Sequence, residues 1–244
     1  MKATPEAQRA LLDLQALDTR LAQLAHRERT LPEREALART DAEADAARSA
    51  LAAARGSQED ASAELGRLEA DTAVVAARIR RDGERLVSSS SVKDVAALEA
   101  ELASLRRRQS DLEDMELAIM ERHEAIGEEV GSAQAALDEV EARRAALQAA
   151  IDDALAQIAA ERADVERRRA EEAARTEAEL LALYERQRAR YGIGAALLRG
   201  GVSGGSGVAL TESDLAEIRR AAPDEVVLCP DSGCILVRTA ESGL

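Results

Sequence analysis

The most reactive side chains in the sequence belong to two cysteines near the C-terminus, Cys229 and Cys234. They flank residues 230–233, and short β-branched runs lie on either side, a pattern that predicts a small β-hairpin with a tight turn. The two thiols would face one another across this hairpin and oxidise in air if their Cα atoms lay within about 4.4–6.8 Å. Two cysteines are too few for a disulfide framework. We therefore expect a pair of free thiols in a reducing compartment.

A second motif surrounds Ser203, where residues 201–205 read Gly-Val-Ser-Gly-Gly and fit the string of a hydrolase nucleophile elbow. That elbow requires a preceding strand, a following helix, and a histidine and an acid nearby. Here a long predicted helix precedes the serine, and both histidines, His26 and His123, fall in predicted helical arms. The glycines also lack the Lys-Ser/Thr that completes a phosphate-binding loop. We interpret the segment as a flexible connection and expect no enzyme activity.

Basic residues form the third group of candidates. Lys93 and the triplet Arg106, Arg107 and Arg108 are candidate contacts for nucleic-acid phosphates or for a protein partner, and residues 167–169 form a second arginine triplet. Consecutive side chains splay around a helix, and nearby acids can pair with them across one turn. The net charge of −14 repels nucleic acid and anionic membranes. A solvated, ion-paired face is therefore the favoured interpretation, and we predict weak, salt-sensitive nucleic-acid binding.

The elements that carry these residues are helical. Two tyrosines, no phenylalanine and no tryptophan, beside 46% hydrophobic and 33% charged residues, indicate a long helix or coiled coil rather than a compact core. A seven-residue apolar repeat begins at Leu98 and continues to Val165 without a slip, which predicts a left-handed coiled-coil seam. Polar residues interrupt this seam, and such positions cost stability and can fix register. They are Gln109, Glu116, His123, Arg144 and Glu161.

A weaker repeat in the first arm and a polar link over residues 87–91 predict an antiparallel helical hairpin. We expect arms over about 5–86 and 92–191, with a phase shift near Pro32. This hairpin would be a rod about 120 Å long, at 1.5 Å per residue. We expect a Gly-rich connection over 192–207 and a small tail over 208–244, with a helix that starts after Thr211 and stops before Pro223. The fold class is mostly α.

A coiled-coil hairpin followed by a small C-terminal hairpin unit resembles the bacterial C4-type zinc-ribbon coiled-coil family, commonly described as nucleic-acid-binding. The similarity covers nearly the whole chain. Its more specific motifs are residues 91–94 with 105–114, residues 183–186, and the tail segments 222–227 and 235–238.

The resemblance also implies where zinc would bind. The family pattern has two Cys-x-x-Cys pairs, whose positions fall on Ser203, Ser206, Cys229 and Ser232. Three of the four are serine, whose hydroxyl stays protonated near neutral pH, whereas structural zinc takes thiolate or imidazole ligands. Cys234 is an additional cysteine. We therefore expect no metal and no cofactor, and a degenerate zinc-ribbon-like tail that is kept folded by packing.

Two classes of function follow. The first is a non-enzymatic coiled-coil adaptor that binds a protein partner through the helical rod or its tip. The family resemblance links this adaptor to transcription or RNA regulation, since some family members are described as partners of a sigma factor. The alternative is a nucleic-acid-binding protein that acts through the ribbon-like tail and the basic residues of the rod. No apolar run reaches the roughly 18–20 residues of a membrane span, and the N-terminus has no apolar signal core. We expect a cytoplasmic protein without a membrane partner; the oligomeric state is left open.

Overall fold

The computed structural model describes all 244 residues, which divide into two compact units. One unit comprises Glu33–Ala149, and the other combines Met1–Pro32 with Ala150–Leu244. None of the helices combines the length with the apolar composition that a membrane span requires.

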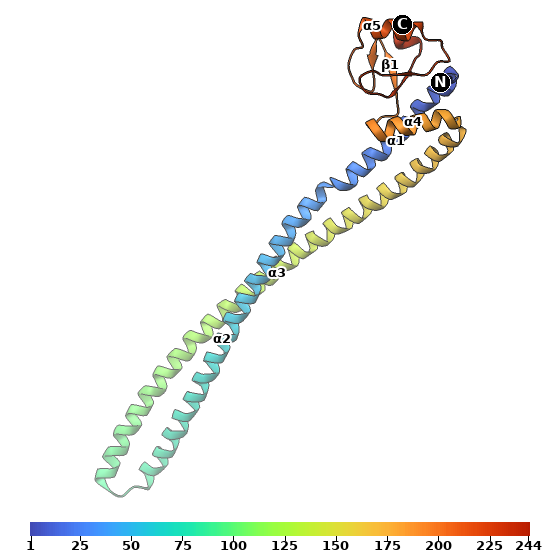
Figure 1. The fold of residues 1–244 in the computed structure, drawn as a ribbon. Helices are drawn as coiled ribbons and strands as arrows, with labels where there is room; N and C mark the ends of the chain where they lie inside the picture. The colour runs from blue at the N-terminus through green and yellow to red at the C-terminus, as the bar shows by residue number, and fades with distance from the viewer. The chain divides into compact units, whose positions relative to one another are not determined.

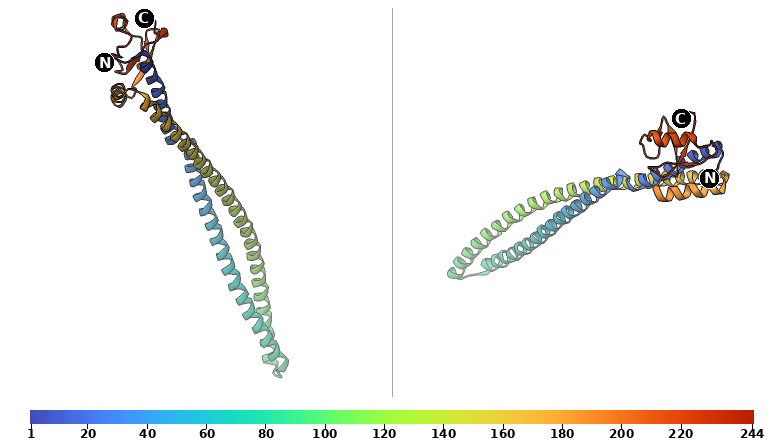
Figure 2. Two further views of the ribbon diagram at one scale, coloured as in Figure 1. Left: turned by 90° about the vertical axis from the view of Figure 1, so that its right-hand side faces the viewer. Right: turned by 45° about the horizontal axis from the view of Figure 1, so that its top comes forward.

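The first unit, Glu33–Ala149, is a helical hairpin. It is built from α2 (Pro32–Ser88) and the first two thirds of α3 (Val92–Arg175), which run antiparallel beside one another in Figures 1 and 2. A short polar link joins them, and the Ser91 hydroxyl accepts a hydrogen bond from the Asp94 backbone N–H (3.4 Å), as expected of a helix cap. The predicted antiparallel hairpin is confirmed.

The seam of this hairpin follows the predicted repeat. Every large apolar residue that is buried along α3 belongs to it, as Leu112 and Ile119 do where they pack against Leu68 of α2. Two polar seam positions contact the facing helix: His123 Nε2 lies 3.0 Å from the Ser62 hydroxyl, and Arg144 pairs with Asp41 of α2. Because these polar contacts are specific to one register, they align the two helices.

In the second unit each expected arm is divided. The first arm breaks after α1 (Pro5–Arg29), because Pro32 occupies the first turn of α2, where a proline is tolerated only as a helix start. The second arm breaks at residues 176–177, between α3 and α4 (Ala178–Tyr191). The break lets α4 bury Leu180 and Tyr184 in a core that a continuous helix would not reach. Expectation and structure therefore differ here: there are four long helical segments rather than two.

The tail forms a four-stranded sheet in the order β2-β1-β4-β3. Strand β1 (Ala195–Arg199) pairs in parallel with β4 (Ile235–Val237), and both outer pairings, with β2 (Val202–Ser203) and β3 (Val227–Leu228), are antiparallel. The segment expected to be a Gly-rich connection thus holds two strands. Its glycines at positions 200 and 201 have positive φ and form the tight turn between them.

The sheet is covered on both faces. On one face Ile235 and Val237 pack with Leu11 and Leu14 of α1 and with α4. On the other face Leu236 packs with Leu198 and with Ile218 of α5 (Glu212–Arg220), whose N-terminus carries a capping box made by Thr211 and Asp214. A final 3-10 turn spans Ala240–Ser242. The side chain of Leu228, in β3, is exposed.

Candidate functional site

A cluster of two thiols and two serine hydroxyls lies beneath the β3–β4 turn. Cys229 and Cys234 are both buried, and both pack in the apolar cluster on the α5 side of the sheet. The Ser232 backbone N–H donates to Cys229 Sγ (3.5 Å), and the Ser232 hydroxyl donates to Cys234 Sγ (3.2 Å). Ser203, at the end of β2, is fully buried beside them. The structure thus brings together three of the four family ligand positions and Cys234.

The two thiols differ in their acidity. Burial acts to raise the pKa of Cys229, but hydrogen bonds from Ser203 and Ser232 together outweigh burial, so its pKa lies below the ordinary value. Burial raises the pKa of Cys234, and the hydroxyl of Ser232 offsets only part of that effect. The cluster therefore favours the thiolate form at Cys229 rather than at Cys234.

These residues do not fit a four-thiolate zinc site. Ser206, the fourth family position, accepts a hydrogen bond from the Val208 backbone N–H (3.3 Å) rather than joining the cluster. The Ser232 hydroxyl donates to Cys234 Sγ (3.2 Å), and a serine hydroxyl that stays protonated is a poor zinc ligand. Gly205 packs against the cluster, where an added Cβ would lie 2.5 Å from Cys234 Sγ. Two thiols alone do not complete a structural zinc site.

Ser203 also lacks the surroundings of a catalytic serine. Its hydroxyl accepts a hydrogen bond from the Gly205 backbone N–H (3.3 Å), and the residue is fully buried. The preceding strand β1 does exist, contrary to the sequence expectation, but no helix follows directly, and His26 is exposed on α1. A nucleophile elbow needs both the helix and a facing histidine.

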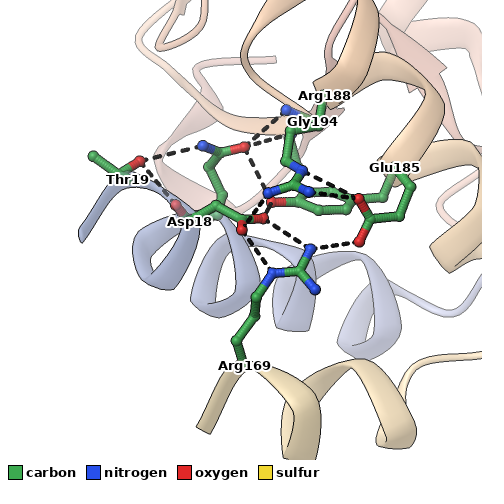
Figure 3. Close-up of polar contacts among 9 residues, drawn as sticks. Asp18, Thr19, Arg169, Glu185, Arg188 and Gly194 are labelled. Carbon is green, nitrogen blue, oxygen red and sulfur yellow. Dashed lines mark hydrogen bonds and ion pairs between the residues drawn. The ribbon is translucent and has the colours of Figure 1, made fainter. Parts of the chain in front are cut away.

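A second polar cluster, which the sequence did not predict, is centred on Asp18 of α1 (Figure 3). This carboxylate is nearly buried and accepts hydrogen bonds from Arg169 Nε (2.6 Å), from Arg188, and from the Tyr184 hydroxyl (2.6 Å). Glu185 pairs with both guanidinium groups. The cluster joins α1, the end of α3 and α4, so its role is to position helices.

Gln15 extends the Asp18 cluster to the sheet. Its side-chain oxygen accepts hydrogen bonds from the backbone N–H groups of Gly194 (2.8 Å) and Ala195 (3.4 Å), at the start of β1. The sequence motif 183–186 contains Tyr184 and Glu185, and the second arginine triplet contains Arg169, but neither pattern indicates that these residues meet at Asp18. In the second arginine triplet, Arg167 and Arg169 both form ion pairs with acidic residues.

The predicted basic contacts lie on the other unit, around the hairpin link. We call residues 78–110 the distal segment; it carries eight Lys or Arg and five Asp or Glu residues, a net charge of +3 within a chain of −14. Arg78 pairs with Glu101 (2.6 Å), and Arg85 contacts Asp82. The remaining six cations of the segment are exposed and form no ion pair. They are Arg80, Arg81, Lys93, Arg106, Arg107 and Arg108.

Comparison with known proteins shows that the helical part and the tail each match a known family model. Residues 14–192 match the family model of the CT398-like coiled coil hairpin domain, and residues 202–236 match that of the C4-type zinc ribbon domain. A Mycobacterium tuberculosis protein described as uncharacterized is 41% identical over 98% of each chain.

Two solved structures share the fold. One from Mycobacterium smegmatis is 34% identical, covers 98% of this chain and 100% of its own, and superposes with a TM-score of 0.84. CT398 from Chlamydia trachomatis is 19% identical, with coverage of 95% and 97% and a TM-score of 0.62. The family resemblance found in the sequence is confirmed.

Proposed function

Because the chain belongs to the CT398-like coiled-coil hairpin family, we propose that it is a non-enzymatic interaction protein whose hairpin binds an acidic protein partner through the distal segment. The observation that carries the proposal is the group of six unpaired cations on that segment. Farther along the same hairpin, arginines such as Arg48 and Arg122 are paired with acids of the facing helix. Unpaired positive charge around the hairpin link of an acidic protein attracts and orients an acidic surface.

Exposed apolar residues support a protein partner at the same place. Val87 and Val92 flank the link between the helices and are 89% and 86% exposed. A partner that buried them would gain about 1.5–3 kcal/mol for each side chain. Nucleic acid would gain less here, because single-strand recognition relies on aromatic stacking and the only aromatic residues, Tyr184 and Tyr191, lie in α4. A role in transcription or RNA regulation belongs to this proposal and is supported by the family resemblance alone.

Photo-crosslinking tests the proposal. A photoreactive amino acid replaces Val87 in the full chain, and a matched control places it at exposed Ala50 in the middle of α2. After irradiation in a nuclease-treated lysate, we expect protein adducts at position 87 and not at position 50. These adducts should weaken as salt shortens the range of the charges. Adducts that disappear after nuclease treatment would favour the nucleic-acid alternative, and equal adducts at both positions would refute a site at the distal segment.

Charge reversal identifies the contribution of the cations. The variant R107E/R108E, combined with the crosslinker at position 87, should lose most of the adduct. The control R34E/R39E reverses two arginines that are also exposed and unpaired but lie at the opposite end of α2. The control should retain the adduct, because total charge changes equally and only its position differs. Equal losses in both variants would mean that net charge, and not the distal segment, governs binding.

A further inference from the structure

The proposed interaction does not use the two cysteines, although the fold places them opposite one another. The β3–β4 pairing ends at Leu228 and Ile235, so Cys229 and Cys234 are the next pair in the register. The Cys229 backbone N–H donates to the Cys234 carbonyl oxygen (2.8 Å), and the Cys229 carbonyl oxygen accepts from the Gly233 backbone N–H (2.9 Å), so the ladder continues by one step as a bulge in which Gly233, at positive φ, and Cys234 both lie opposite Cys229. Directly opposite residues in an antiparallel pair have Cα atoms about 4.5–5.5 Å apart, which lies within the Cα separation that a disulfide accepts.

The side chains also point to the same place. Both cysteines pack with Leu236 in the cluster on the α5 face of the sheet, so neither sulfur is turned to the opposite face. Both sulfurs accept hydrogen bonds from one residue, Ser232: its backbone N–H reaches Cys229 Sγ (3.5 Å), and its hydroxyl reaches Cys234 Sγ (3.2 Å). Two sulfurs that accept hydrogen bonds from one small residue are close to one another. These hydrogen bonds also stabilise the reduced thiols in their buried position.

We propose that Cys229 and Cys234 form a peroxide-reactive thiol pair that closes reversibly to an intrachain disulfide. The Cys229 thiolate attacks one oxygen of hydrogen peroxide, the O–O bond breaks, and the products are a sulfenic acid and, after protonation of the leaving hydroxide, one water. Cys234 sulfur then attacks Cys229 Sγ, the S–O bond breaks, and a second water leaves with the Cys234 proton. The two thiols lose two electrons, which reduce the peroxide. An external dithiol reverses the reaction by thiol–disulfide exchange.

The order of the two steps follows from the hydrogen bonds. Cys229 Sγ accepts from a backbone N–H and lies beside the buried Ser203 hydroxyl, and such donors stabilise a thiolate. Cys234 is fully buried, which suits the resolving thiol. Access is through the four-residue turn, whose first two residues, Pro230 and Asp231, are exposed. A small peroxide reaches the sulfurs when this turn opens, so the reaction should be slower than that of an exposed thiol.

The experiment treats the reduced full chain with hydrogen peroxide, blocks the remaining thiols and analyses the protein by mass spectrometry. We expect a monomer that has lost two hydrogen atoms, with a peptide linkage between Cys229 and Cys234 that a dithiol reverses. The variant C234S should accumulate sulfenic acid at Cys229, trapped by dimedone, whereas C229S should trap much less at Cys234. These two variants test the order of attack, and circular dichroism checks that they fold.

A matched control shows that the oxidant is effective. The variant S110C in a C229S/C234S background carries one exposed thiol on α3 and cannot form an intrachain pair. The proposal fails if S110C is oxidised while both native thiols of the wild type stay reduced, or if the wild type forms only disulfide-linked dimers. This test is independent of the distal segment, so its failure leaves the proposed interaction function standing. The wild-type result alone decides the proposal if a cysteine variant fails to fold.

Discussion

Replacing Asp18 with alanine is the sharpest test of how the sheet is held to the helices. In the structure this carboxylate is only 7% exposed and joins α1 to Arg169, Arg188 and Tyr184. The substitution removes the shared acceptor and leaves two guanidinium groups and a phenol hydroxyl that were arranged around it. The substitution should not destabilise helix α1 itself, because alanine has a higher helix propensity than aspartate.

The expected loss follows from the remaining partners. Removal of one member of a buried ion pair costs about 3–5 kcal/mol, since a charge is left uncompensated. Glu185 still contacts both arginines, and the Tyr184 hydroxyl still lies 3.3 Å from Gln15 Oε1, so the lower end of that range applies. We predict a destabilisation of about 3 kcal/mol for the unit that contains the sheet.

Hydrogen exchange on D18A is the appropriate assay, because two compact units need not unfold in one transition. Amides of β1 and α4 should exchange faster by roughly a hundredfold, which is the factor that about 3 kcal/mol predicts, whereas amides of the Glu33–Ala149 hairpin should not change. The matched control is D13A, which removes an exposed acid without an ion pair from the same helix. If the amides of β1 exchange at the same rate in D18A and D13A, the Asp18 cluster does not help to hold the sheet against the helices.

Three further outcomes are expected. Burial raises the pKa of the Tyr184 phenol, so the folded state holds this proton more tightly than the unfolded state, whose tyrosine pKa is about 10. The stability that this proton contributes to the folded state is complete below that pH and declines above it. The variant Y184F should abolish this decline in a titration of folding stability against pH. Arg238 donates to five backbone carbonyl oxygens between residues 218 and 225, so R238Q should lower Tm by several degrees, roughly 2–4 °C for each kcal/mol lost. Elemental analysis should find no stoichiometric zinc in the native chain and about one ion in the variant with Ser203, Ser206 and Ser232 all changed to cysteine, by the four-thiolate rule; one tightly held zinc per native chain would contradict this.

The helical part of the fold could be predicted because its determinants are local. The repeat from Leu98 to Val165 fixes a stripe on one helix whatever its partner is, and the polar link before Val92 requires the chain to reverse. The breaks at residues 30–31 and 176–177 were harder to predict. Only the first has a local signal, Pro32, whereas the second depends on the core that Leu180 and Tyr184 enter.

The sheet and the polar clusters could not be predicted fully, because they depend on partners distant in the sequence. Strand β1 lies among glycines and is stabilised by parallel pairing with β4, about forty residues later, which no local pattern encodes. Asp18 resembles any other acid on an amphipathic helix until Arg169 and Arg188 are placed around it. The hairpin around Cys229 and Cys234 was predicted because its strands are adjacent in sequence and its turn is short.

The contacts around the tail support the expectation that packing keeps it folded with serine at three of the family's metal positions. A unit of this size has too small a core to be stable alone, but here the sheet is covered by α1 and α4 on one face and by α5 on the other. The N-terminus adds backbone pairing, since the Ala3 N–H donates to the Asp224 carbonyl oxygen (2.8 Å) and the Val226 N–H to the Met1 carbonyl oxygen (3.1 Å). These contacts connect the tail to the beginning of α1 as a crosslink would. Deleting residues 1–3 should therefore weaken the tail while leaving the Glu33–Ala149 hairpin intact, because only the tail loses packing and backbone hydrogen bonds.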